Sequence, residues 1–234
     1  MNKQSIAIIG GMGPEASAYL YNTLIKQSID LYNAVNNDDF PKIILYSIPV
    51  PDFISSNDKK NEALEMLKES VADLNKLDLL CVCIACNTAH VLIDDLKVSS
   101  RIPFVSMIDE VVKEVRKDKI KKVGLLGTPS TISSNMYQDA LGAVGIESVI
   151  PDKNDLKYLE RIIRNIIAGS TNKRDAKILE EVSNRLKKRG ANGIILGCTE
   201  IPLVFPTKYS LPVYNSVKIL SMALLQKYYK RKIS

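Results

Sequence analysis

The sequence repeats one set of landmarks, once in each half of its 234 residues. An apolar segment ends in glycine at Gly10, and a similar segment ends at Gly127. Further along each half, a second apolar segment ends in a cysteine followed by small polar residues, first at Cys86 and again at Cys198. The two glycine-to-cysteine spacings are nearly equal. Chance seldom produces the same order twice, so the repeat predicts two homologous lobes.

Within each half, short β-rich segments alternate with longer segments of helical periodicity, which is typical of βαβ units and a parallel sheet. We expect strands at residues 5–10, 42–48, 78–85, 102–106, 121–127, 147–150, 193–197 and 212–214. We expect helices at residues 14–31, 58–76, 88–98, 107–118, 131–143, 154–168, 173–189 and 216–230. The predicted fold is α/β: two pseudosymmetric lobes, each a mainly parallel sheet flanked by helices, with the active site in the cleft between them.

The expected lobe boundaries follow the repeat. Residues 1–106 plus 213–234 form the predicted N-terminal α/β lobe, which carries the first of the two repeated cysteines. Residues 107–212 form the predicted C-terminal α/β lobe, which carries the second. At about 150 residues per domain the chain is longer than one domain and shorter than two. Two small lobes account for that length.

Composition narrows the class of protein. Hydrophobic residues make up 46% of the chain and charged residues 25%, which are ordinary values for a globular protein. The longest apolar run, 79–86, is far shorter than the ~20 residues that a membrane-spanning helix needs. The N-terminus enters an apolar strand without the basic and apolar regions of a signal peptide. We therefore expect a cytoplasmic protein that does not bind a membrane.

The net charge is +6, but the lysines that produce it are spread along the chain. Nucleic-acid binding favours clustered arginines with exposed aromatic residues, or a helix-turn-helix signature, and the sequence has neither. The charge is typical of a solvated surface. We expect no nucleic-acid partner.

The chain has four cysteines, Cys81, Cys83, Cys86 and Cys198, and a single histidine, His90. In a reducing compartment these cysteines are free thiols rather than a disulfide framework. One histidine nearly excludes mechanisms that need several imidazoles, such as hydrolysis at a histidine-rich zinc site. Acid–base chemistry then falls mainly to Cys, Asp, Glu, Lys or Tyr.

Cys86 and Cys198 occupy the positions where open parallel sheets bind their ligands, beyond the carboxyl ends of strands. If the two lobes face each other about a pseudo-twofold axis, the two thiols flank one cleft from opposite sides. Proton transfer by two bases requires that arrangement, because one thiolate removes a proton from a carbon while the opposite thiol returns one to the other face. A helix N-terminus lowers the pKa of a free thiol from about 8.5, so a strand-to-helix turn suits this role.

Other interpretations of the cysteines remain. Cysteine is often simply a small buried residue, which is the role we expect for Cys81 and Cys83, two residues apart on one face of a strand. The run from Cys83 to Cys86 matches the C-x-x-C of thiol oxidoreductases, but redox chemistry leaves Cys198 and the repeat unexplained. The in-strand spacing of these thiols does not suit tetrahedral zinc. We expect no metal.

Small polar residues follow the two repeated thiols, namely Asn87, Thr88 and Thr199. Unpaired amides at a helix N-terminus, with hydroxyl and amide side chains, suit a carboxylate ligand. The same residue types are also favoured as plain helix N-caps. The glycine-rich turn 10–14 has backbone N–H groups for an anion, but it lacks the G-x-G-x-x-G of a dinucleotide site.

Three runs of residues resemble the aspartate/glutamate racemase superfamily, and its aspartate racemase-like branch in particular. They are Gly10-Gly11-Met12-Gly13-Pro14, Cys86-Asn87-Thr88-Ala89-His90 and Gly197-Cys198-Thr199-Glu200. Glutamate racemases usually carry Cys-Thr-His, rather than Cys-Thr-Glu, at the second site. The resemblance extends over essentially the whole chain.

The resemblance implies a racemase that needs no cofactor, is commonly a homodimer and acts on an amino acid as its small-molecule substrate. Cys86 and Cys198 are the implied catalytic proton donors and acceptors. The implied substrate-binding residues are Asn87, Thr88, Thr199, Thr128, Met12 and Phe53. Two more residues are candidates for support: His90 orients groups near the first thiol or is a helix-surface or capping residue, and Glu200 tunes the second thiol or favours a helix N-terminus.

The chain departs from the aspartate racemase pattern at two positions. Where that branch reads Pro-Asp-Arg after the second strand, this chain has Phe53 in place of the arginine. Where the family often has a lysine in a helix of the second lobe, this chain has Ile167. A buried carboxylate needs a charge partner, so both changes bear on side-chain specificity. Arg161 and Arg164, upstream of Ile167, are candidate replacements.

The sequence therefore predicts a cofactor-independent amino-acid racemase with aspartate or glutamate as the default substrate. A racemase for a less acidic amino acid and a cysteine-based isomerase of small dicarboxylic acids are the alternatives. A thiol redox protein and a non-catalytic amino-acid-binding protein fit less well, because both repeated cysteines are present.

Overall fold

The computed structural model describes residues 4–52 and 58–230. Eight strands lie in this part of the chain: β1 (Ser5–Gly10), β2 (Ile43–Ser47), β3 (Leu79–Ile84), β4 (Phe104–Val105), β5 (Lys122–Gly127), β6 (Glu147–Val149), β7 (Ile194–Gly197) and β8 (Val213–Asn215). The α-helices are α1 (Pro14–Tyr32), α2 (Lys60–Leu74), α3 (Ile93–Ser99), α4 (Met107–Lys117), α5 (Pro129–Ser133), α6 (Met136–Gly142), α7 (Lys153–Ile167), α8 (Lys173–Lys188) and α9 (Ser216–Lys230). Short 3₁₀ helices are η1 (Asn37–Asp39), η2 (Thr88–Leu92) and η3 (Ile201–Leu203). No helix in the described ranges is long and apolar enough to cross a membrane.

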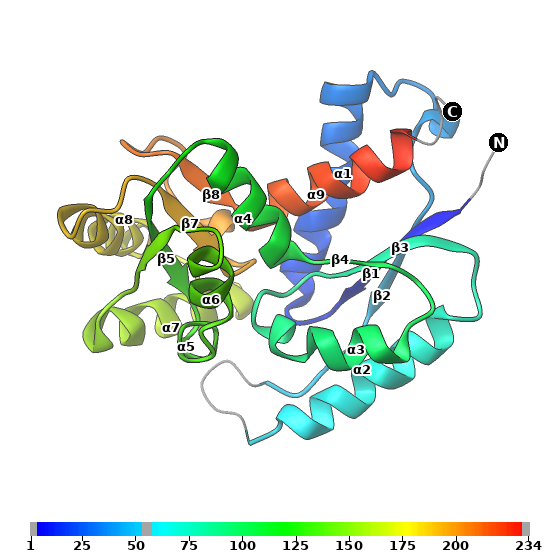
Figure 1. Cartoon of the computed structure of the whole chain (residues 1–234), viewed down its shortest axis with the longest axis horizontal. Coiled ribbons are helices and arrows are strands. Elements are labelled where there is room, and N and C mark those ends of the chain that lie inside the picture. The colour runs from blue at the N-terminus through cyan, green and yellow to red at the C-terminus, as the bar shows by residue number, and fades with distance from the viewer. Residues whose placement is uncertain (1–3, 53–57, 231–234) are drawn as a thin grey trace. The chain divides into compact units, whose positions relative to one another are not determined.

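The chain divides into two compact units, coloured along the chain in Figure 1. The described residues of the first unit are 4–52, 58–107 and 217–230. Its four strands form a parallel sheet in the order β2-β1-β3-β4. In this register Ile9 of β1 lies between Tyr46 of β2 and Ile84 of β3, so these three strands end at the same edge.

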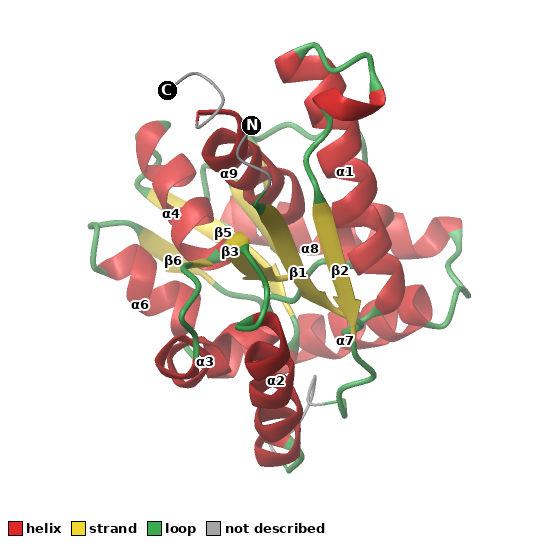
Figure 2. Cartoon of the chain, turned by 90° about the vertical axis from the view of Figure 1, so that its right-hand side faces the viewer, coloured by secondary structure: helices red, strands yellow, loops and turns green. Residues whose placement is uncertain are grey.

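Strand alternation divides the core of the first unit between two faces of its sheet. Ile6 and Ile8 of β1 belong to the cluster that contains Leu20 of α1 and Leu220 of α9. The side chains between them point to the opposite face, on which α2 and α3 lie (Figure 1). Figure 2 shows β1 and β2 side by side, with α1 along them. Helices therefore cover both faces, as a parallel sheet requires.

The second unit contains residues 108–216. Its parallel sheet has the order β6-β5-β7-β8, so β5 and β7 hold the central places that β1 and β3 hold in the first unit. Leu126 and Leu196 of these central strands pack against apolar faces of α7 and α8, for example at Ile163 and Val182. The two units thus repeat one strand order. Two pseudosymmetric lobes with mainly parallel sheets, as the sequence predicts, are confirmed.

The structure corrects three details of the predicted elements. The strand expected at 212–214 is β8, and it pairs with β7, so residues 213–215 belong to the second sheet rather than the first lobe. The helix expected at 88–98 begins as the 3₁₀ helix η2 before it becomes α3. The helix expected at 131–143 is two helices, α5 and α6, because Asn135 between them is left-handed, with φ of 58°. Asparagine tolerates that conformation better than most residues do.

Candidate active site

The first thiol lies just beyond β3, where the buried strand turns into η2. Cys86, Asn87 and Thr88 are all buried in this turn. The backbone continues the parallel register up to this point, because the N–H of Ala85 donates to the carbonyl of Ile9 at 2.8 Å. Cys86 is therefore presented at the carboxyl edge of the sheet, where the sequence predicts it.

His90 bridges the first thiol turn to the start of α4. Its Nδ1 lies 2.8 Å from the carbonyl oxygen of Cys86, and its Nε2 accepts the N–H of Met107 at 3.0 Å. An Nε2 that accepts a backbone N–H carries no proton, so the ring is neutral and Nδ1 donates to Cys86. The ring is buried. The ring therefore joins the backbone of the thiol turn to the first residue of α4 and is not a helix-surface residue, while its role in orienting groups near the thiol stays a prediction.

The glycine-rich turn that contains Met12 lies beside Cys86 at the same sheet edge, because β1 pairs with β3. Gly11 has φ of +94°, and a Cβ there would lie 2.2 Å from the carbonyl oxygen of Ile48. Ser17 of α1 closes the turn: its Oγ accepts the N–H of Gly11 at 2.9 Å and donates to the carbonyl of Gly13 at 3.0 Å. Met12 is half-buried in this turn.

The second thiol lies beyond β7 in the second unit, where the chain turns into η3. Cys198, Thr199 and Glu200 are all buried there. Oε2 of Glu200 accepts two hydrogen bonds, one from Sγ of Cys198 at 2.9 Å and one from Oγ1 of Thr199 at 3.0 Å. Glu200 thus contacts the second thiol directly, which favours the tuning role over a helix-dipole role.

Thr128 lies beside this second turn, because Gly127 pairs with Gly197 in the register of β5 and β7. It is the N-cap of α5: its Oγ1 accepts the N–H of Thr131 at 3.0 Å and donates to the Thr131 hydroxyl at 2.9 Å. Both threonines are buried. Thr128 therefore stabilises the start of α5, and its role in binding substrate stays a prediction.

Tyr137 of α6 also lies in this region, although no sequence pattern indicates it. Its side chain is fully buried, and it lies close enough to Gly197 that a Cβ there would contact the ring at 3.3 Å. Burial raises the pKa of the Tyr137 phenol far above its ordinary value, and the charge of an ionised Cys198 raises it further. An isolated tyrosine in a helical segment gives no signal of such a position.

Cys81 and Cys83 are core residues of β3, as predicted. Both side chains are fully buried, and none of the four cysteines, all of which lie in the described ranges, forms a disulfide. Burial raises the pKa of Cys81 to about 11, against a smaller opposing effect of the Lys227 charge. Burial likewise raises the pKa of Cys83 well above its ordinary value, with a further contribution from Cys81. Neither thiol is poised for reaction.

The candidate replacements for the missing cations are engaged with neighbours on α7. Nε of Arg164 donates to Glu160 at 3.1 Å, and the guanidinium of Arg161 lies 5.3 Å from the ring centroid of Tyr158. Ile167, at the position of the family lysine, is 42% exposed. Phe53, at the position of the family arginine, lies outside the described residues.

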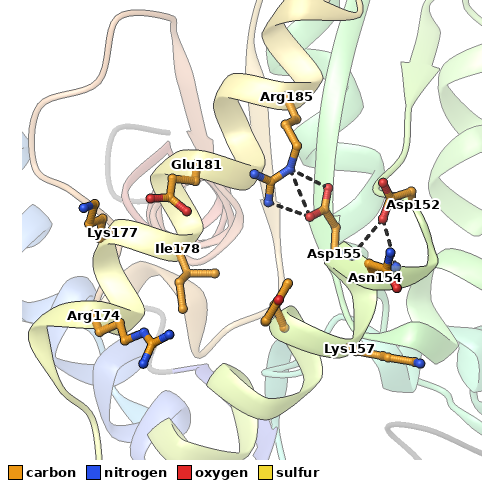
Figure 3. A pocket seen from close by; sticks show the side chains of 10 residues that line it. Asp152, Asn154, Asp155, Lys157, Arg174, Lys177, Ile178, Glu181 and Arg185 are labelled. Atoms are coloured by element: carbon orange, nitrogen blue, oxygen red, sulfur yellow. Dashed lines mark hydrogen bonds and ion pairs between the residues drawn. The ribbon is translucent and has the colours of Figure 1, made fainter.

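An open pocket of about 870 Å³ lies between α7 and α8 (Figure 3). Its lining consists of Asp152, Asn154, Asp155, Lys157, Tyr158, Arg174, Lys177, Ile178, Glu181 and Arg185. A bidentate ion pair lies at one end of the pocket, where Arg185 contacts the buried Asp155 at 2.6 to 3.1 Å. No residue of the second thiol turn lines this pocket, so it is separate from that turn. The described residues also contain no group of three or more His, Cys, Asp or Glu placed to hold a metal.

Comparison with known proteins identifies the family. The family model Asp/Glu/Hydantoin racemase matches residues 9–224. The broad specificity amino-acid racemase RacX of Bacillus subtilis (strain 168) is 26% identical over 232 residues, covering 95% of this chain and 97% of the relative. The structure of the Picrophilus torridus aspartate racemase has a TM-score of 0.83 at 28% identity, covering 95% of this chain and 93% of that one.

A second structure, of an aspartate racemase homologue from Pyrococcus horikoshii OT3, has a TM-score of 0.79 at 30% identity. It covers 95% of this chain and 98% of that one. The similarity in sequence and in fold extends over nearly the full length of both chains. The chain therefore belongs to the Asp/Glu/Hydantoin racemase family and is an isomerase of the racemase class.

Proposed function

We propose that the protein racemises amino acids without a cofactor, with Cys86 and Cys198 as the two proton-transfer groups. The observation that carries the proposal is the repeat of one thiol turn in two units of equal strand order, each beyond the third strand of its sheet. Racemisation interconverts two mirror-image molecules, so its forward and reverse directions need equivalent groups. Two thiols in equivalent positions suit such a reaction. Relatives named as amino-acid and aspartate racemases support the same reaction.

The proposed reaction needs one base and one acid on opposite faces of the same carbon. A thiolate takes the α-proton, and the electron pair of the broken C–H bond remains on the α-carbon. The opposite thiol then gives its proton to that pair from the other face, which inverts the centre. The thiolate is the productive form because the thiol itself is not the nucleophile or base.

The carbanion is the intermediate of highest free energy in this reaction, and the residues around the thiols are suited to stabilise it. Asn87 and Thr88 follow the first thiol, and Thr199 and Thr128 lie at the second. We propose that these side chains and the nearby backbone amides hold the α-carboxylate, onto which the negative charge spreads. Preorganised donors of this kind act most strongly where water is excluded.

We propose aspartate or glutamate as the default substrate. A less acidic amino acid is the second candidate, and two observations favour it. The exposed Ile167 supplies no charge, and Arg161 and Arg164 are already engaged with Tyr158 and Glu160. The Bacillus subtilis relative is itself named for broad specificity.

The proposal includes a homodimer in the cytoplasm, which the family resemblance implies. Light scattering coupled to size exclusion tests the dimer. A mass close to twice the 26.0 kDa of the chain supports it, and a mass close to that of one chain contradicts it.

The function is tested by incubating the purified protein with each L-amino acid in D₂O, without added pyridoxal phosphate. Proton NMR follows loss of the α-proton, and chiral chromatography follows the D-enantiomer. We expect both signals for at least one amino acid, and neither in the Cys86→Ser/Cys198→Ser double variant. Absence of exchange for every amino acid would contradict the proposal.

A further inference from the structure

The second thiol turn holds a buried carboxylate against its cysteine, and that pairing restricts where the proton lies. Glu200 is 4% exposed, and so is Cys198. One oxygen of the carboxylate, Oε2, accepts from Sγ of Cys198 at 2.9 Å and from the hydroxyl of Thr199 at 3.0 Å. Both donors are neutral groups, so neither cancels the carboxylate charge.

The proton of this pair belongs on sulfur. An ordinary thiol holds its proton up to a pH about 4 units higher than an ordinary carboxyl group does. The bond is therefore S–H donating to a carboxylate. Removing that proton would place a negative sulfur within 3 Å of a negative oxygen, in a buried turn where like charges interact strongly.

A titratable side chain of another element also interacts electrostatically with Cys198. It is Tyr137 of α6, and burial keeps its phenol protonated. It therefore brings no positive charge to the sulfur. The carboxylate of Glu200 opposes a thiolate at this position.

The first thiol turn differs at the corresponding residues. Two residues after Cys86 the chain has Thr88, where the second turn has Glu200. The titratable side chain of the first turn is His90, and its ring is neutral because Nε2 accepts the N–H of Met107. The first turn thus has no acidic residue next to its cysteine in the chain.

We propose that Glu200 is a positioning residue that keeps Cys198 protonated in the resting protein, so that Cys86 is the thiol that ionises first. The catalytic meaning of this assignment rests on the proposed racemase function. In the first half-cycle the Cys86 thiolate takes the α-proton and becomes a thiol, while Cys198 gives its proton and becomes a thiolate. Proton exchange with water, out of Cys86 and into Cys198, then restores the resting form.

Steady-state rates are a poor readout of this asymmetry. Racemisation has an equilibrium constant of one, so kcat/KM is equal for the two enantiomers whatever the resting protonation. The thiols must be measured directly. Iodoacetamide serves as the probe, because alkylation requires the thiolate.

The experiment alkylates the full-length protein with limiting iodoacetamide across a pH series, without substrate. Mass spectrometry quantifies the Cys86 and Cys198 peptides separately. The two thiols differ in access, so the comparison uses the pH of half-maximal rate rather than the maximal rate itself. The fully buried Cys81 and Cys83 are internal reporters, because their alkylation signals unfolding.

We expect the Cys86 curve to rise at least about one pH unit below the Cys198 curve in the wild type. Glu200→Gln keeps an acceptor oxygen but removes the charge, and it should move the Cys198 curve down by at least about one unit while the Cys86 curve stays. Glu181→Gln removes an exposed charge of α8 and is the matched control, which should move neither curve.

Two results would overturn the proposal: Cys198 ionising at or below the pH of Cys86 in the wild type, or an unmoved Cys198 curve in Glu200→Gln. If Glu200→Gln does not fold, the order of the two wild-type curves still decides the question. Because no substrate is present, the outcome is independent of whether any amino acid is racemised. A failed D₂O assay with the expected alkylation order would reject the function and retain the protonation assignment.

Discussion

The two thiol turns occupy the same place in two units of the same strand order, yet different groups support them. The first turn is held by the neutral imidazole of His90, which bonds to the backbone on both sides. The second is held by the carboxylate of Glu200, which bonds to the thiol itself. The shared strand order sets where each sulfur lies. The neighbouring side chains set how each turn is held and which sulfur retains its proton.

The largest expected difference in stability between the two units concerns the glycines that end β1 and β5, Gly10 and Gly127. A Cβ on Gly10 would lie 2.5 Å from Oγ of Ser17, which closes the glycine-rich turn, whereas a Cβ on Gly127 would lie 3.1 Å from the nearest atom of Thr131. We expect Gly10→Ala to lower the free energy of unfolding by about 3 kcal/mol and Gly127→Ala by about 1 kcal/mol. Urea unfolding of both variants measures this, and equal losses would show that the two turns are equally tight.

The imidazole of the first turn is expected to matter more for stability than the carboxylate of the second. His90→Ala leaves the buried N–H of Met107 without its acceptor, and we expect a loss of about 2 kcal/mol. His90→Gln, which offers both a donor and an acceptor, should recover part of that loss. Glu200→Gln keeps an acceptor for its neutral donors and should cost less than about 1 kcal/mol. A reversed order in thermal or urea unfolding would contradict the division of roles.

Ion pairs give a third contrast between the units. In the second unit Arg185 pairs with Asp155, whose side chain is buried, while in the first unit Lys68 pairs with an exposed Glu65. Removing the basic partner leaves a buried charge without its counter-ion only in the second unit, at Asp155. Because Arg185 is itself half-exposed, we expect Arg185→Met to cost about 2 kcal/mol, and Lys68→Met less than about 0.5 kcal/mol. Similar unfolding free energies for the two variants would remove the contrast.

The smallest expected effect concerns pH and the core of the first unit. Three residues before the thiol, β3 has Cys83 where β7 has Ile195, and β3 has Cys81 as well. Burial raises the pKa of Cys81 to about 11 in the folded protein. The unfolded chain therefore loses this proton first, so the stability is present below about pH 9 and is lost as the pH rises from there toward about 11.

We expect this loss to reach about 1.5 kcal/mol near pH 10. Cys81→Ala removes the group, so urea unfolding at pH 8 and pH 10 should show a smaller decline in the variant than in the wild type. Other groups that titrate between these two pH values contribute equally to the decline in both proteins, so they do not affect the comparison. Parallel declines in the two proteins would show that Cys81 is not the cause.

Most of the fold is predictable from the sequence because strands buried on both faces and amphipathic helices leave clear patterns, such as β3 and α2. The thiol turns are predictable because the repeat marks them. The break between α5 and α6 is not predictable, since it depends on one left-handed residue, Asn135. The place of Tyr137 is not predictable because only packing brings it to Gly197, and the engagement of Arg164 depends on the direction of its side chain.

The central claim, that one thiol acts on each face of the same carbon, is tested most directly with the single variants Cys86→Ser and Cys198→Ser. Each is incubated in D₂O with the separate enantiomers of an amino acid that the wild type racemises. We expect racemisation to fall by at least about 10³-fold in both. Cys86→Ser should exchange the α-proton of one enantiomer only, and Cys198→Ser that of the other. Normal racemisation by both variants, or exchange of the same enantiomer by both, would contradict the account.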